Sequence, residues 1–377
     1  MSDGYTAVID EEDGLNPKPF QIDLLSASVN KNPKFSTLLT LYDQVPHYSV
    51  EYSLTGNNAR STQFQVANSV WFLENSPAVV MLDAKKDEEA ETISRFAGKR
   101  EELIMAGLIK LATANPVMSG DKLGVPFYLR ELQRIISVGG KTRYSLTEIK
   151  LALRILKNSN YRLKNYSEDG AKQSWEYSQI SELLSSSYGK GSDDRYFVVF
   201  NRLLTEQILN LQTRLYNFDR FKELHRSLSR PLYVRLCIRF VQASDDTTYT
   251  IKISTLRQLG GLASNEAMAI DKRRLPVINA FKELIKSGVL KSYKKVKAIQ
   301  IRPENSTNNR KKTIDEEYEL TAAPDFIAEQ KKASAIRNEE AAKMEIADSK
   351  EGELTAQDKN SILNLPLALS TKVIQDK

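Results

Sequence analysis

The chain has 377 residues, of which 41% are hydrophobic and 27% charged, so it is long enough for two or three domains and is not disordered throughout. Its 54 basic residues exceed its 48 acidic residues, which gives a net charge of +6. The single cysteine excludes an internal disulfide. No apolar run reaches the ~18 residues of a membrane span, and the acidic amino terminus lacks a signal-peptide core. We therefore expect a soluble cytoplasmic protein.

The first quarter of the chain predicts an arm followed by an extension. Residues 1–45 are polar, contain three prolines and have no long periodicity, which predicts a flexible arm. Residues 46–98 form an N-terminal extension of unassigned role. There, alternating apolar residues over 47–82 predict strands, and a helical pattern begins near residue 85 and continues to Ala114.

Residues 99–225 predict a first unit with a strand, a helix, a Gly-containing turn and a second helix. Ser145 and Glu148 have the spacing of a capping box at the start of the second helix. The segments NYRLKNY and SWEYSQI, separated by a Ser-Glu-Asp-Gly turn, then predict a hairpin. A strand over 195–201 follows, and helical patterns run from Leu203 to about Gln242.

Residues 226–322 repeat this layout. YTIKISTLRQLGG predicts a strand and a helix, LPVINAFKELIKSG a second helix, and KSYKKVKAIQIR with TIDEEYELT a hairpin. Each copy has the outline of a winged helix, in which one helix enters a DNA groove and a β-ribbon, the wing, lies beside it. The predicted fold class is α+β: two tandem winged-helix domains, the N-terminal extension, and a partly disordered acidic tail over 323–377.

The positive charge is concentrated in the second unit. From Arg257 to Lys312 there are 14 basic and four acidic residues, a local charge of +10, which is typical of a surface that binds phosphates. Asn279 and Lys282 are suitable residue types for contacts with base edges. The candidates for phosphate contacts are Arg273, Arg274, Lys286, Lys291, Lys294, Lys295 and Lys297, with Lys150, Arg154 and Lys157 on the first unit. The alternative is that these residues only form a solvated face.

The sequence offers little for catalysis. Two histidines and one cysteine provide neither zinc-finger spacing nor the metal site of a rolling-circle nickase. The Val-Gly-Gly-Lys-Thr segment at 138–142 lacks the earlier glycine and the preceding strand of a phosphate-binding loop. We therefore expect a protein that is not an enzyme and that has no cofactor or metal.

Three stretches carry a family resemblance: RYSLTEIKLALRILKNSNYRL, RYFVVFNRLLTEQILNLQTRLYNFDRFKELHRSLSRPLYVRL and DKRRLPVINAFKELIKSGVL. Over residues 100–320 the chain resembles the replication initiator (Rep) proteins of iteron-regulated theta-replicating plasmids. The resemblance implies that the second winged helix binds direct repeats at the plasmid origin, and that the first contacts DNA or forms a dimer interface. It also implies that monomers open the origin, that homodimers repress the protein's own gene, and that the host initiator and replicative helicase are recruited.

The tail contains one apolar island, Asn-Leu-Pro-Leu-Ala-Leu. Its Leu365, Leu367 and Leu369 resemble the short peptides that bind the bacterial sliding clamp, with asparagine in place of the usual glutamine. The alternative is a hydrophobic turn without a partner, or a helix that docks on its own domain.

Two other functions remain open at this stage. One is a winged-helix transcription regulator that binds an inverted repeat, and the other is a DNA-organising or partition protein that binds DNA without sequence specificity.

Overall fold

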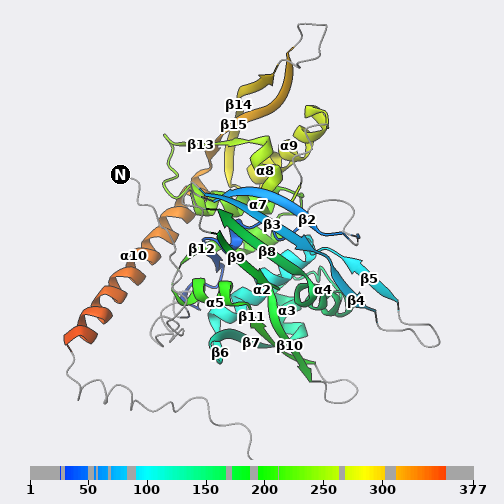
Figure 1. Cartoon of the computed structure of the whole chain (residues 1–377). Coiled ribbons are helices and arrows are strands. Elements are labelled where there is room, and N and C mark those ends of the chain that lie inside the picture. The colour runs from blue at the N-terminus through cyan, green and yellow to red at the C-terminus, as the bar shows by residue number, and fades with distance from the viewer. Residues whose placement is uncertain are drawn as a thin grey trace, which may run out of the picture. The chain divides into compact units, whose positions relative to one another are not determined.

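The computed structural model describes residues 26, 30–49, 55–56, 58–66, 69–82, 91–166, 172–186, 194–210, 212–262, 268–301 and 311–353 (Figure 1). The chain falls into two units, Met1–Ser334 and Ala335–Lys377, and the candidate DNA-binding residues belong to the first. Within the described ranges, no helix is long and apolar enough to cross a membrane.

The described residues form a mixed α+β fold, as the sequence predicts. The helices are η1 (Tyr42–Gln44), α2 (Lys99–Ala114), α3 (Leu129–Ile136), α4 (Leu146–Asn158), α5 (Arg202–Leu209), α6 (Phe218–Glu223), α7 (Ser229–Arg239), α8 (Ile253–Leu259), α9 (Ile270–Lys286) and α10 (Pro324–Glu353). The strands are β1 (Phe35–Leu39), β2 (Arg60–Val66), β3 (Ser69–Ser76), β4 (Ala78–Met81), β5 (Thr92–Arg95), β6 (Val117–Ser119), β7 (Lys122–Tyr128), β8 (Asn160–Tyr166), β9 (Lys172–Tyr177), β10 (Ile180–Ser186), β11 (Arg195–Phe200), β12 (Thr213–Asn217), β13 (Thr248–Lys252), β14 (Leu290–Ile301) and β15 (Lys312–Ala322).

One sheet topology occurs twice along the chain. In the second half, β13 is followed by α8, α9 and the hairpin β14–β15, and β15 lies between β13 and β14 with antiparallel pairing on both sides. In the first half, β7 is followed by α3 and α4, and β11 lies between β7 and β10, again antiparallel. The two halves therefore share one order of strand, helix, helix and closing hairpin.

The first copy contains an additional hairpin between α4 and β10. Strands β8 and β9 pair with each other as the sequence predicts, but β8 also pairs with β3 in a sheet of order β2-β3-β8-β9 (Figure 1). Trp71 and Trp175 stack in this sheet with ring centroids 5.6 Å apart, so they pack against each other. The extension formed by β2 and β3 is thus joined to the first copy through backbone hydrogen bonds.

Helix α2 precedes the first copy in the chain and packs against its α3, α4 and β7. It begins at a capping interaction in which the Gly98 backbone N–H donates to Glu101 Oε2 at 2.8 Å, and Leu103, Ile104 and Leu108 are fully buried. At Gly107 a Cβ atom would lie 2.8 Å from a methyl group of Ile136, which is closer than real Cβ contacts. The missing side chain therefore allows α3 to pack closely against α2.

The flexible arm that the sequence predicts over residues 1–45 is too long. Strand β1 lies near the end of the range 1–45, where it pairs with β12 and has five buried residues. Tyr42 in η1 is 1% exposed. Residues 35–45 therefore belong to the core. The arm was predicted from local polarity and prolines, but the partner strand of β1 lies more than 170 residues later in the chain.

Two predicted helical regions are also corrected. The helix expected from residue 85 begins at Lys99, because residues 92–95 pair with β4 as strand β5. Between α5 and α6, where a continuous helical pattern was expected, residues 213–217 form β12. In both places the pairing with another strand overrides the local helical pattern.

Candidate nucleic-acid interface

Helix α9 is longer than the sequence predicts. It begins at Ile270 rather than near Leu275, so the Asp-Lys-Arg-Arg segment is helical and Pro276 lies inside the helix. Proline has no backbone N–H, so the Lys272 carbonyl lacks its usual helical donor. The helix ends at the expected Ser287-Gly288 break, where Gly288 has φ +71° and its carbonyl accepts a hydrogen bond from Arg220 at 2.7 Å.

One side of α9 is anchored in the core of the second copy. Val277, Ala280, Phe281 and Leu284 are at most 1% exposed. The Phe281 ring lies 5.0 Å from that of Tyr293 on β14, so the same side chain holds the helix against the hairpin. Ile285, which the helical pattern includes in this buried face, is 37% exposed.

The opposite side of α9 carries several basic and polar residues in one stripe. Residues spaced by three or four positions share one face of a helix. The lysines of this stripe are exposed, and Asn279 is half-buried among them. We call it the α9 stripe, and its polar residues are Lys272, Asn279, Lys282 and Lys286. The prediction missed Lys272, although its spacing from Asn279 would have revealed it once the helix start was known.

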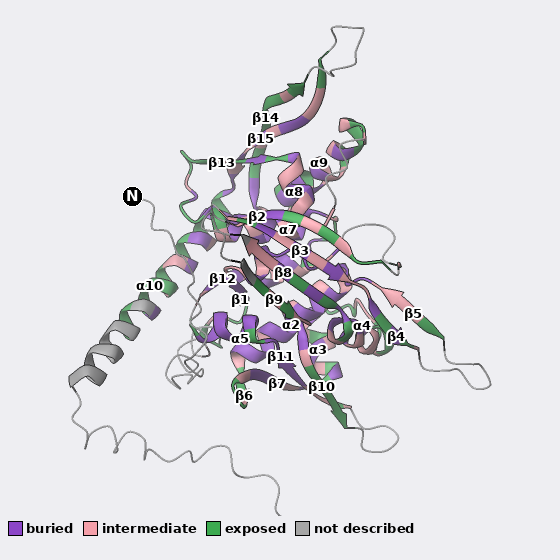
Figure 2. Cartoon of the chain, in the orientation of Figure 1, coloured by how far each residue is buried: buried purple, intermediate pink, exposed green. Residues whose placement is uncertain are grey.

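Strand β14 places further lysines beside α9. Lys291, Lys294 and Lys297 are exposed, and the outer part of β14 lies open to solvent (Figure 2). Within the described part of the chain, no ion pair involves these lysines or those of the α9 stripe. They are therefore available to an anionic partner.

Strand β15 is acidic, but two of its acids bind residues outside β14. Asp315 accepts hydrogen bonds from the backbone and hydroxyl of Ser254 at 3.2 and 2.6 Å. Glu319 accepts one from the Thr248 hydroxyl at 2.8 Å. These contacts reduce the extent to which β15 neutralises the lysines of β14.

Glu316 forms a buried cluster with two of the candidate phosphate ligands. Arg274 donates to both of its carboxylate oxygens, at 2.7 and 2.5 Å, and Lys295 Nζ lies 2.5 Å from one of them. Burial alone would raise the pKa of Glu316, but hydrogen bonds from Arg274, Lys295 and Tyr318 lower it to about 2. Arg274 thus holds α9 to the hairpin, and Lys295 joins the two strands of the hairpin to each other.

Arg273 lies apart from the other candidates. Its side chain is 5% exposed, on the core side of α9, whereas the neighbouring Arg274 reaches Glu316. One residue corresponds to about 100° around a helix, so adjacent arginines face different surroundings. The structure therefore divides the expected phosphate ligands into one buried residue, two residues paired with Glu316, and a group of exposed lysines.

The basic side chains of α4 are half-buried and are bound to neighbouring residues. Lys150 forms a salt bridge with Asp194, which precedes β11, and Lys157 donates to the Ser181 carbonyl of β10. Arg154 donates to the Met81 carbonyl of β4 at 3.3 Å. The predicted capping box at the start of this helix is present, with Ser145 accepting from the Glu148 backbone at 3.2 Å. The α4 residues thus hold adjacent strands, unlike the exposed lysines of α9.

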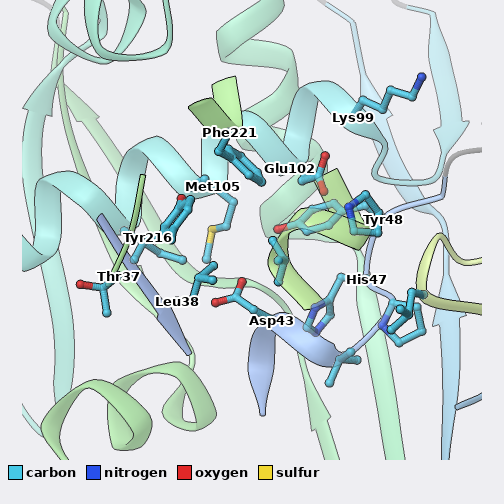
Figure 3. A pocket seen from close by; sticks show the side chains of 17 residues that line it. Thr37, Leu38, Asp43, His47, Tyr48, Lys99, Glu102, Met105, Tyr216 and Phe221 are labelled. Atoms are coloured by element: carbon cyan, nitrogen blue, oxygen red, sulfur yellow. The ribbon is translucent and has the colours of Figure 1, made fainter. Parts of the chain in front are cut away.

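A small cavity is lined by residues other than the lysines of α9 and β14. Asp43 and His47, from the segment after β1, line it together with Lys99 and Glu102 of α2 (Figure 3). Its volume of about 50 Å³ suits a few water molecules rather than an organic ligand. Burial raises the pKa of Asp43 to about 7 and lowers that of His47 to about 3.

Other sequence expectations concern residues without an interface role. Cys237 is fully buried, and burial raises the pKa of its thiol to about 12, so the thiol is unreactive at neutral pH. Among the residues that the structure describes, no group of three or more His, Cys, Asp or Glu side chains is placed to hold a metal ion. The proposed clamp-binding residues Leu365, Leu367 and Leu369 lie outside the described residues.

No protein-family model matches the chain, and no curated protein matches it. Among solved structures it is similar to the crystal structure of domains 2 and 3 of RctB, with 12% identity, a TM-score of 0.45, and coverage of 75% of this chain and 98% of that one. It is also similar to the crystal structure of the Pi initiator protein in complex with iteron DNA, with 12% identity, a TM-score of 0.38, and coverage of 59% and 91%.

Proposed function

We propose that this chain is a sequence-specific double-stranded DNA-binding protein that initiates plasmid replication by binding direct repeats at the origin. The observation that carries the DNA-binding part is the α9 stripe, which lies opposite the buried face of its helix and beside the exposed lysines of β14. Lysine and asparagine on a surface helix are suited to the major groove, and lysines on an adjacent ribbon are suited to phosphates.

In this proposal the two copies of the repeated topology are tandem winged helices. In the second copy α9 is the recognition helix and β14–β15 is the wing. In the first copy α4 and β10–β11 occupy the corresponding positions, because β11 pairs with β7 as β15 pairs with β13. Hairpin β8–β9, which the sequence suggests as the first wing, is then an insertion.

The second copy makes the main DNA contact. Asn279 and Lys282 read base edges, while Lys286, Lys291, Lys294 and Lys297 bind phosphates. Arg274 contributes by fixing the angle between helix and wing, and Lys295 by joining the two strands of the wing. The first copy contributes less through Lys150, Arg154 and Lys157, because these side chains already bind neighbouring strands, and it provides a dimer interface.

The replication role rests on the resemblance found in the sequence. The protein binds origin repeats as a monomer, recruits the host initiator and replicative helicase, represses its own gene as a homodimer, and catalyses no reaction. A tail contact with the sliding clamp through Leu365, Leu367 and Leu369 belongs to the same proposal. Recovery on immobilised clamp tests that contact, and equal recovery of wild type and Leu367→Ala would rule it out.

A footprint of the purified chain on the DNA that flanks its own gene tests the proposal. Protection of several direct repeats, each roughly two helical turns long, is expected of an initiator. Protection of a single inverted repeat would instead indicate a transcription regulator. Uniform protection that competitor DNA removes would indicate binding without sequence specificity and would refute the proposal.

A further inference from the structure

Leu275 is an exposed apolar residue in the middle of the α9 stripe. Its side chain is 62% exposed, although it lies on a helix whose other large apolar residues are mostly directed to the core. Single exposed leucines are common on protein surfaces. The position of this one is informative because it follows Lys272 by three residues and precedes Asn279 by four.

The helical geometry places Leu275 on the side of α9 that faces away from the core. With about 100° between successive residues, Lys272, Leu275 and Asn279 fall within a narrow arc of the helix circumference. The buried Val277 and Phe281 lie on the opposite side. Any duplex that approaches the lysines of the α9 stripe therefore meets Leu275 as well.

The major groove offers one apolar group for such a side chain. Thymine carries a 5-methyl group there, whereas the other edges present hydrogen-bond donors and acceptors. Lysines on both sides of Leu275 attract phosphates and bring the helix to the groove, but a leucine has no favourable contact with a phosphate. Recognition helices also read bases mainly through their amino-terminal residues, and Leu275 lies in the second turn of α9.

We propose that Leu275 contacts the 5-methyl group of a thymine and thereby helps to determine the DNA sequence that this chain selects. The inference rests on the proposed function and adds a specific base to it. Asn279 follows one turn later on the same stripe and suits an adenine edge. The recognised site should therefore contain A·T pairs at the positions beneath the amino-terminal half of α9.

Replacement of thymine by deoxyuridine tests this contact, because it removes only the methyl group. The specific site is first selected from a random duplex library with the full chain. Each thymine is then replaced singly, and the binding of the modified duplex is measured. At one or two positions we expect binding to weaken by about fourfold, which corresponds to the loss of one buried methyl group.

The variant Leu275→Ala should bind the thymine and deoxyuridine duplexes equally. Ile285→Ala is the matched control, because Ile285 is also exposed on α9 but lies off the stripe, and this variant should still discriminate. Equal binding of the thymine and deoxyuridine duplexes by the wild type at every position would overturn the inference. So would a Leu275→Ala variant that still prefers the thymine duplex, or a loss of this preference in both variants. Failure to select any sequence would refute the proposed function itself.

Discussion

Arg274 and Glu316 form a two-point contact between a helix and a hairpin: Nε and Nη2 of the arginine donate to the two oxygens of the carboxylate, at 2.7 and 2.5 Å. Glu316 is fully buried, and Arg274 is about one-third exposed. Because planar pairs of this kind fix orientation as well as distance, α9 and β15 are held at one angle. The spacing between the α9 stripe and the lysines of β14 depends on that angle.

Replacing Glu316 by glutamine should therefore destabilise the second copy. The change removes the charge that Arg274 and Lys295 share, and we expect a loss of about 1–3 kcal/mol in the free energy of unfolding. Urea unfolding of the full chain measures it. The control Glu317→Gln changes a half-buried neighbour and should alter the free energy of unfolding by less than about 0.5 kcal/mol. Equal effects in the two variants would contradict a structural role for Glu316.

Lys282→Ala should weaken binding to the selected DNA site by about 1–3 kcal/mol if the side chain reads a base edge, with a smaller effect on unrelated DNA. Titration of both DNAs at one salt concentration measures the difference. Lys252→Ala is the control, because Lys252 is an exposed lysine on β13, outside the α9 stripe. A uniform loss on both DNAs would place Lys282 on phosphates instead, and no loss would remove α9 from the interface.

The adjacent residues Lys294 and Lys295 should behave differently. Lys294 has no ion pair within the described ranges, whereas Lys295 is bound to Glu316. Lys294→Ala should weaken binding to all DNA and lower the slope of log K against log salt by about 1. Lys295→Ala should change this slope less and reduce the free energy of unfolding. Identical salt slopes in the two variants would show that both lysines meet phosphates.

Asp43 should make the protein less stable as the pH rises. Its pKa is raised to about 7 by burial in the folded state, so the folded chain binds the proton more tightly than the unfolded chain. The stabilisation is complete below the ordinary carboxyl pKa and is lost as the pH rises through about 7. Relative to Asp43→Asn, we expect the wild type to lose about 1–3 kcal/mol between pH 4 and pH 8, after allowance for partial exposure.

The comparison with the asparagine variant is needed because His47 lies in the same cavity and acts in the opposite direction. Its pKa is lowered to about 3, so its contribution falls as the pH decreases below its ordinary value. Glu102, which also lines the cavity, has a raised pKa and adds to the effect of Asp43. Parallel pH profiles of wild type and Asp43→Asn would show that Asp43 does not titrate in this range.

Local signals were sufficient for the second copy. The spacing of Val277, Phe281 and Leu284, the Ser287-Gly288 break and the alternation that follows identify a helix, a turn and a strand without reference to the rest of the chain. Ser145 and Glu148 identify the start of α4 in the same way. The concentration of lysines on α9 and β14 could also be predicted from the sequence. Both elements are long, and their lysines follow one another at short intervals along the chain.

The fine structure of the site was not accessible from the sequence. Arg273 and Arg274 look equivalent in the sequence, yet one is buried and the other meets Glu316, which is 42 residues further along the chain. The basic stripe of α4 is also clear in the sequence, but its partners come from β4, β10 and the residue before β11. Such contacts depend on the tertiary arrangement, and helical periodicity carries no information about them.

The pairing of β1 with β12 affects how the polypeptide acquires its structure during synthesis. Residues 35–39 leave the ribosome early, but their hydrogen-bonding partners at 213–217 are made much later. Until then the backbone of β1 lacks its partner strand, although β1 also contacts α2, which is made earlier. Domains commonly fold as units from the amino terminus during translation; here the early segment must wait until more than half of the chain has been translated.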